Sequence, residues 1–121
     1  WAIKLIDTLS DNKYLISYCR GFLRDIYKYL INAEVHMYRF EDAAKHFEEL
    51  KERMENHYEF YQSVLADETE KAKYSDRQIG FMEAYTKEFI AEKQNDIINY
   101  ILGCWPGEQA EKFSEAIGCN Q

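Results

Sequence analysis

The sequence predicts an all-α fold, a four- or five-helix bundle or a short helical array, and three observations lead to this expectation. Apolar side chains recur every three to four residues over most of the 121 positions, which is the period of an amphipathic helix. The chain contains two valines, one proline and five glycines, so it lacks the β-branched alternation and the turn residues of a sheet protein. Its length predicts a single domain, residues 1–121, that is large enough to bury a core.

The first expected elements lie before residue 39. Residues 2–9 form a short apolar-periodic segment that ends at Ser10-Asp11-Asn12, residue types that cap or interrupt helices. A long helix is expected from about residue 12 to Tyr38. Its central apolar stripe contains Leu15, Cys19, Phe22, Ile26, Leu30 and Ala33, and Ile16, Leu23, Tyr27 and Ile31 widen the stripe sideways.

A heptad pattern then runs through residues 33–64, and the pattern itself does not decide whether the backbone bends between Tyr38 and Phe40. We call this pattern the predicted seam and expect it to contact a partner helix or a second copy of the chain. The residues predicted to form this surface are His36, Phe40, Phe47, Leu50, Met54, His57, Tyr58 and Tyr61.

The next helix start is marked by Ser75. Together with Gln78 it has the spacing of a capping box, in which each residue bonds to the backbone of the other. One helix is expected from there to Gly103, followed by Pro106, since glycine and proline commonly follow a helix end. A final short helix is expected over residues 108–117.

Charge and cysteine content restrict the environment of the chain. The formal net charge is -7 and the basic residues are interleaved with acidic ones, which disfavours direct nucleic-acid contact and binding to an anionic membrane surface. No apolar run is long enough for a membrane span and no signal peptide is recognisable. Three cysteines, an odd number, favour a reducing compartment, so we expect a soluble, cytoplasmic protein. Because the chain begins at Trp1 rather than Met, it is compatible with a fragment of a longer protein.

Residues 27–50 resemble one tetratricopeptide repeat, a helix-turn-helix unit of 34 residues. The matching positions are Tyr27, Leu30, Phe40, Ala43, Phe47 and, with a larger side chain, Leu50. A fainter match follows in register over residues 61–84, at Tyr61, Val64, Tyr74, Phe81 and Ala84. The departures from the repeat are Ile31 and Leu65 in place of glycine, Glu34 in place of tyrosine, Arg77 in place of a small residue, and a missing closing proline. The resemblance implies a protein-binding helical array, whereas a generic amphipathic bundle explains most of the same positions.

A second resemblance concerns residues 41–102, whose long acidic helix, polar loop and second helix are similar to the helical dimerisation module of PadR-type bacterial repressors. In that family a winged helix precedes the module, and no winged helix precedes it here. The resemblance implies a dimerising regulatory domain.

Candidate chemistry is sparse. His46, Glu49, Arg53 and His57 share one helical side, but the two imidazoles lie ~16 Å apart along a helix and a guanidinium stands between them, so no metal site and no cofactor are expected. Cys104 follows a helix C-terminus, where the dipole disfavours a thiolate nucleophile. No phosphate loop, nucleophile elbow or paired acid and base is recognisable, so no catalytic residue is assigned.

Ten tyrosines are unusual for this length and suit either an aromatic pocket or a protein interface. The leading hypothesis is a non-enzymatic protein–protein interaction or dimerisation module, with a protein partner or a homodimer. The first alternative is a ligand-sensing domain of a bacterial transcriptional regulator, with a small-molecule effector in an aromatic-lined pocket. The second alternative is a small enzyme that uses acidic residues.

Overall fold

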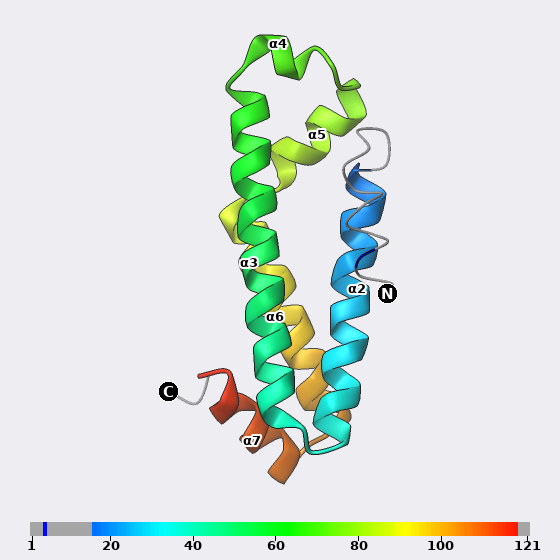
Figure 1. Ribbon diagram of the computed structural model, residues 1–121, viewed down its shortest axis with the longest axis vertical. Helices are drawn as coiled ribbons and strands as arrows, with labels where there is room; N and C mark the ends of the chain where they lie inside the picture. The colour runs from blue at the N-terminus through cyan, green and yellow to red at the C-terminus, as the bar shows by residue number, and fades with distance from the viewer. Residues whose placement is uncertain (1–3, 5–15, 119–121) are drawn as a thin grey trace.

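The computed structural model describes residue 4 and residues 16–118, and within that part it contains helices and no strand. The helices are α2 (Ile16–His36), α3 (Phe40–Leu65), α4 (Glu68–Lys71), α5 (Asp76–Ala84), α6 (Lys87–Cys104) and α7 (Glu108–Ala116) (Figure 1). The prediction of an all-α fold is confirmed. The expected segment 2–9 and the side chains of Leu15, Cys19 and Phe22 lie outside the described residues.

The two longest helices, α2 and α3, form an antiparallel hairpin joined by residues 37–39 (Figure 1). Helix α6 packs against both of them, and α7 lies across the end of the hairpin that contains the turn. Helices α4 and α5 form the connection at the opposite end. The chain therefore bends at Tyr38, the point that the heptad pattern left undecided.

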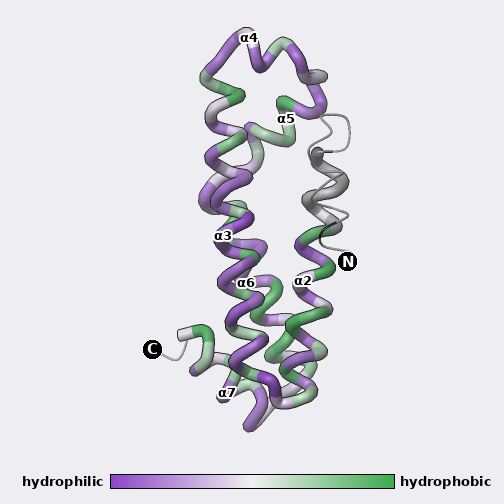
Figure 2. Tube along the Cα trace, viewed as in Figure 1, coloured by the Kyte–Doolittle hydropathy of each residue, from purple (hydrophilic) through white to green (hydrophobic). Residues whose placement is uncertain are grey.

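The core lies between the hairpin and α6, with contributions from α5 and α7. It contains Leu23, Tyr27, Ile31 and Val35 from α2, six residues of α3 from Ala43 to Val64, and Met82, Tyr85, Ile90, Ile97, Ile101 and Phe113 from the later helices. Figure 2 shows hydrophilic residues recurring along α3, as expected for a helix with one apolar side.

The central stripe of α2 differs from the expected one. Ile26 and Leu30 are only half-buried and Ala33 is exposed, whereas Ile31 and Val35 are fully buried. Leu23, Tyr27 and Ile31, which were expected to widen the stripe, are thus at its centre. For Ala33 and His36 the physical reason is the turn at residues 37–39, because a heptad continued across it places them on the wrong side of α2.

The single helix expected from Ser75 to Gly103 is wrong, since the structure has two helices there. The capping box at Ser75 is confirmed: its Oγ accepts from the Gln78 backbone N–H at 3.2 Å, and Gln78 Oε1 accepts from the Ser75 N–H at 2.9 Å. The first helix ends at Ala84, and Thr86 begins the second by accepting from the Phe89 N–H at 3.1 Å. This N-cap lies inside an unbroken apolar pattern, which is why the pattern alone suggests one helix.

Candidate functional site

The predicted seam lies largely inside the chain. Phe47, Leu50, Met54 and Tyr61 are at most 3% exposed and belong to the hydrophobic core. Because these side chains already pack against the helices of their own chain, the interhelical contact that the pattern indicates is made within the molecule. These four residues are therefore corrected from partner surface to internal core.

The other four residues of the predicted seam lie nearer the surface. His57 and Tyr58 are half-buried on α3, and the Lys87 ammonium lies 5.8 Å from the Tyr58 ring centroid. Phe40 is half-buried at the start of α3, and His36, expected at a core position, is exposed at the end of α2. For these residues a partner surface stays a prediction.

His36 and Phe40 belong to a group of large side chains around the hairpin turn, which we call the turn cluster: His36, Met37, Tyr38, Phe40 and Trp105. The His36 and Trp105 rings stack at 4.3 Å, and the Tyr38 and Phe40 rings meet edge-on at 5.8 Å. Met37 and Tyr38 are 55% and 59% exposed. The turn cluster thus places apolar and aromatic surface in solvent at one end of the molecule.

Tyr38 occupies a backbone position that normally favours glycine. Its φ of 59° is in the left-handed region. The Tyr38 N–H donates to the Val35 carbonyl at 3.1 Å and the Arg39 N–H to the Glu34 carbonyl at 2.8 Å, which is the hydrogen-bond pattern of a Schellman helix end. A side chain with a Cβ costs about 1 kcal/mol in this conformation, so tyrosine is a poor choice for closing the helix.

The C-terminal part of the chain fixes the turn cluster. Trp105 Nε1 donates to Asn32 Oδ1 at 2.6 Å, and Gln109 Nε2 donates to the carbonyl oxygens of Val35 and His36 at 3.2 and 3.3 Å. The Gln109 amide is thus a second donor to the Val35 carbonyl and a donor to the His36 carbonyl at the end of α2, while the Trp105 bond joins two side chains. No local pattern in the sequence marks Trp105 or Gln109, because both bond to residues more than 70 positions away along the chain.

The polar side of α3 that includes His46, Glu49 and Arg53 faces α2. His46 Nδ1 lies 2.8 Å from Oε1 of Glu34, a carboxylate in a residue only 5% exposed. Further along, the Tyr27 hydroxyl donates to Glu49 at 2.5 Å, and Arg53 lies 3.6 Å from the same carboxylate. These groups join the two helices of the hairpin.

Burial, together with the hydrogen bond to Glu49, raises the pKa of the Tyr27 hydroxyl well above its usual range. The hydroxyl is therefore a donor to the carboxylate throughout the neutral range. Among residue 4 and residues 16–118, no three His, Cys, Asp or Glu side chains are grouped so that they could bind a metal ion.

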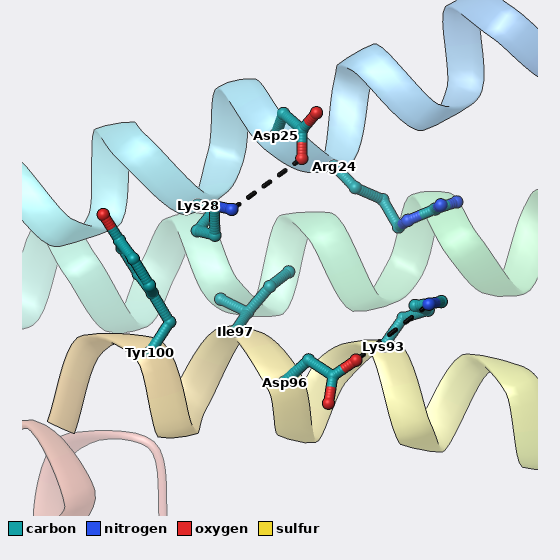
Figure 3. A pocket seen from close by; sticks show the side chains of 7 residues that line it. All are labelled: Arg24, Asp25, Lys28, Lys93, Asp96, Ile97 and Tyr100. Atoms are coloured by element: carbon teal, nitrogen blue, oxygen red, sulfur yellow. Dashed lines mark ion pairs between the residues drawn. The ribbon is translucent and has the colours of Figure 1, made fainter. Parts of the chain in front are cut away.

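A second surface feature lies between α2 and α6, far along α2 from the turn cluster. We call it the basic groove; it has a volume of about 330 Å³ and is lined by Arg24, Asp25, Lys28, Lys93, Asp96, Ile97 and Tyr100 (Figure 3). Lys28 is 4.0 Å from Asp25, and Lys93 is 4.0 Å from Asp96, so both ion pairs are long and lie within single helices. Three cations and two carboxylates leave the groove positively charged in a chain whose net charge is -7.

The tyrosines considered for an aromatic pocket divide between core and surface. Tyr61 and Tyr85 are buried, and their rings contact each other at 5.0 Å and the ring of Phe81 at 5.9 and 6.0 Å. These rings fill space between α3 and α5 instead of lining an opening. Tyr29 and Tyr100 are exposed beside the basic groove, whereas Tyr14 and the side chain of Tyr18 lie outside the described residues.

Comparisons with models of known protein families, with curated proteins and with solved structures find no match. No helix in the described part of the chain is long and apolar enough to cross a membrane. The geometry of the turn cluster and of the basic groove therefore supplies the arguments for function.

Proposed function

We propose that this chain is a non-enzymatic helical interaction module that self-associates through the turn cluster. The observation that carries the proposal is Tyr38, whose aromatic ring is exposed to solvent on a residue in a strained backbone conformation. Strained residues that persist on a surface commonly serve a contact rather than the fold.

The energies favour this interpretation. Glycine at position 38 would close α2 without the cost of about 1 kcal/mol that a Cβ brings in the left-handed region. An aromatic side chain buries roughly 150–250 Å² when fully covered, and covering the exposed 59% of Tyr38 at about 25 cal/mol per Å² would contribute about 2–4 kcal/mol. The free energy gained by burying the Tyr38 ring in a contact would thus exceed the cost of its left-handed backbone conformation.

A second copy is the partner that the charge distribution favours. Two chains of charge -7 repel each other, so they associate most easily where the contact surface is uncharged. Met37, Tyr38 and Phe40 provide such a surface, and the neighbouring Arg39 is neutralised by Asp42 at 2.7 Å. A twofold arrangement would place the same apolar patch of each copy against the other.

Sedimentation equilibrium on the chain and on Tyr38→Gly tests the proposal. We expect the unmodified chain to form dimers in a concentration-dependent manner and Tyr38→Gly to weaken dimerisation by at least about tenfold, because truncating an interface aromatic costs about 2 kcal/mol. The same variant should melt at an equal or higher temperature, since glycine relieves the strain.

Tyr29→Gly is the matched control for loss of ring surface, because Tyr29 is 57% exposed, close to the 59% of Tyr38, but lies within α2 away from the turn. It should leave dimerisation unchanged, although glycine within a helix lowers its melting temperature. A chain that stays monomeric at high concentration, or a Tyr38→Gly variant that dimerises like the parent, would refute the proposal.

A further inference from the structure

The basic groove shows three features that its place in the fold does not require. We infer that it binds an acidic segment of a partner protein, laid along the groove between α2 and α6 with its carboxylates toward Arg24, Lys28 and Lys93. This surface is separate from the turn cluster, so the inference does not depend on self-association.

The first feature is a buried guanidinium nitrogen without a hydrogen-bond partner in the described part of the chain. Nη1 of Arg24 is buried and has no hydrogen-bond partner among the described residues. A guanidinium presents five N–H donors in a planar fork that matches a carboxylate, and a buried donor without an acceptor is costly. An incoming carboxylate would supply the acceptor.

The second feature is the placement of two cations at one end of the groove. The Arg24 guanidinium and the Lys93 ammonium approach the same ring, that of Phe89, at 5.4 and 5.3 Å from its centroid. Both cations lie at one end of the groove, whereas Lys28 and Tyr100 lie at the other (Figure 3). The 4.0 Å pair between Lys93 and Asp96 is too long to neutralise this end fully, so it keeps positive charge that an added anion would offset.

The third feature is the aromatic rim. Tyr29 and Tyr100 are 57% and 40% exposed, and Lys28 Nζ lies 4.8 Å from both ring centroids. Tyrosine and arginine are enriched in the hot spots of protein interfaces, and here they lie beside the buried side chain of Ile97. A small anion would leave these rings uncovered, whereas a peptide would cover them.

Dimensions and charge favour a peptide over a nucleic acid. Lys93 and Tyr100 are seven residues apart on α6 and therefore lie ~10.5 Å apart along its axis, about the length of three extended residues. Asp25 and Asp96 lie in the same groove and would repel a continuous phosphate backbone. A short extended segment with carboxylates on alternate residues meets the cations at both ends of the groove.

The test measures fluorescence anisotropy of a fluorescein-labelled twelve-residue peptide of alternating Glu and Leu, with the complete chain at low salt. We expect this peptide to bind, its Gln-Leu counterpart to bind at least about tenfold more weakly, and the affinity to fall as salt is added, because exposed charge pairs are screened. Arg24→Gln and Lys93→Glu should each weaken binding by about tenfold, the loss expected when one partner of a close charge pair is removed.

The control variant is Lys112→Glu, which makes the same change of charge on an exposed residue of α7 outside the groove. It should retain the binding of the parent, and Tyr38→Gly should also retain it, which separates this inference from the proposed self-association. Circular dichroism of each variant confirms that it is folded.

Several results would overturn the inference. One is equal binding of the Glu and Gln peptides, and another is an equal effect of Lys93→Glu and Lys112→Glu. Binding of inorganic phosphate or of a single-stranded oligonucleotide at the groove without binding of the acidic peptide would also overturn it, since either result would assign the groove to a different anion.

Discussion

The contact between Glu34 and His46 offers the sharpest test of how the hairpin is held together. Glu34 is a buried polar residue of α2, and the imidazole of His46 on α3 lies 2.8 Å from its carboxylate. Replacing His46 by alanine removes this partner from a buried carboxylate. We expect His46→Ala to be destabilised without loss of the helical fold.

The magnitude follows from the exposure of the two groups. Removing one partner of a fully buried ion pair costs about 3–5 kcal/mol. The His46 side chain is 29% exposed, so water can replace part of the lost interaction, and a cost of about 1–2 kcal/mol is expected for a buried acceptor left open to some solvent. For a chain of 121 residues this corresponds to a fall in melting temperature of roughly 4–8 °C.

Urea unfolding at pH 7, followed by circular dichroism at 222 nm, measures this loss. Glu34→Gln and the double variant complete a double-mutant cycle, which separates the coupling of the two side chains from their individual effects. Lys45→Ala is the control, because Lys45 is an exposed neighbour of His46 on the same helix.

A free energy of unfolding for His46→Ala within about 0.3 kcal/mol of the Lys45→Ala value would refute the reasoning, since surface substitutions commonly fall in that range. A double-mutant cycle with no coupling energy would contradict it as well. In either case Glu34 would be stabilised by solvent or by the backbone rather than by His46.

Two further predictions concern Tyr27 and Thr86. Because the pKa of Tyr27 is raised in the folded chain, its contribution to stability is fully present below the unfolded value of about 10 and is lost as pH rises from there. Above pH 10 the free energy of unfolding of Tyr27→Phe should therefore fall less steeply with pH than that of the parent. At pH 7 the substitution should lower this free energy by about 1 kcal/mol through the lost bond to Glu49. An equal dependence on pH in the variant and the parent would contradict the first expectation. Thr86→Ala removes the N-cap that bonds to the Phe89 N–H and should cost about 1 kcal/mol in urea unfolding. Thr69→Ala, a change within the exposed α4, should cost less, and equal costs would argue against the cap.

The helices themselves were predictable because their signals are local. Alternation of apolar and polar residues over three to four positions requires only neighbouring residues, and the capping box at Ser75 needs only Gln78 three positions later. Both signals predicted helices correctly, although the apolar pattern missed the break between α5 and α6 and the buried side of α2. They also indicated which residues of α3 face inward, from Ala43 to Val64.

The breaks between helices were harder to predict, because the residues at these positions are not those that commonly end a helix. A helix end is recognised from glycine or proline, yet α2 ends at His36 and the left-handed residue that follows is Tyr38, which gives no such signal. The end of α5 at Tyr85 and Thr86 likewise lies between apolar residues spaced as in a continuous helix. At the first break, long-range bonds from Gln109 add to the local helix end, and at the second the local signal is a single N-cap, Thr86, within the apolar pattern.

The candidate surfaces depend on long-range contacts even more strongly. Trp105 stacks on His36 across the fold, and the basic groove combines residues of α2 with residues of α6 about 70 positions later. A single sequence contains no signal that brings these positions together. The heptad pattern, in contrast, indicated a seam correctly but could not indicate whether its partner belongs to the same chain.

The position of the turn cluster follows from the polar contacts of the hairpin. In an antiparallel pair, Tyr27 meets Glu49 and, seven residues later, Glu34 meets His46. If α3 slid by one helical turn of about 5.4 Å, both contacts would break together and the buried carboxylate of Glu34 would lose its imidazole partner, whereas Glu49 would keep Arg53. The apolar core alone tolerates such a shift better, because one aliphatic side chain can replace another in a packed layer. The polar contacts therefore fix the register of the hairpin, and through it they fix Tyr38 at the turn with its ring in solvent.

Replacing Glu49 and His46 together by leucine should preserve helix content but allow α3 to shift along α2. The shift would appear as altered accessibility of Tyr38 to chemical nitration. Unchanged nitration in a folded variant would show that the core alone sets the register.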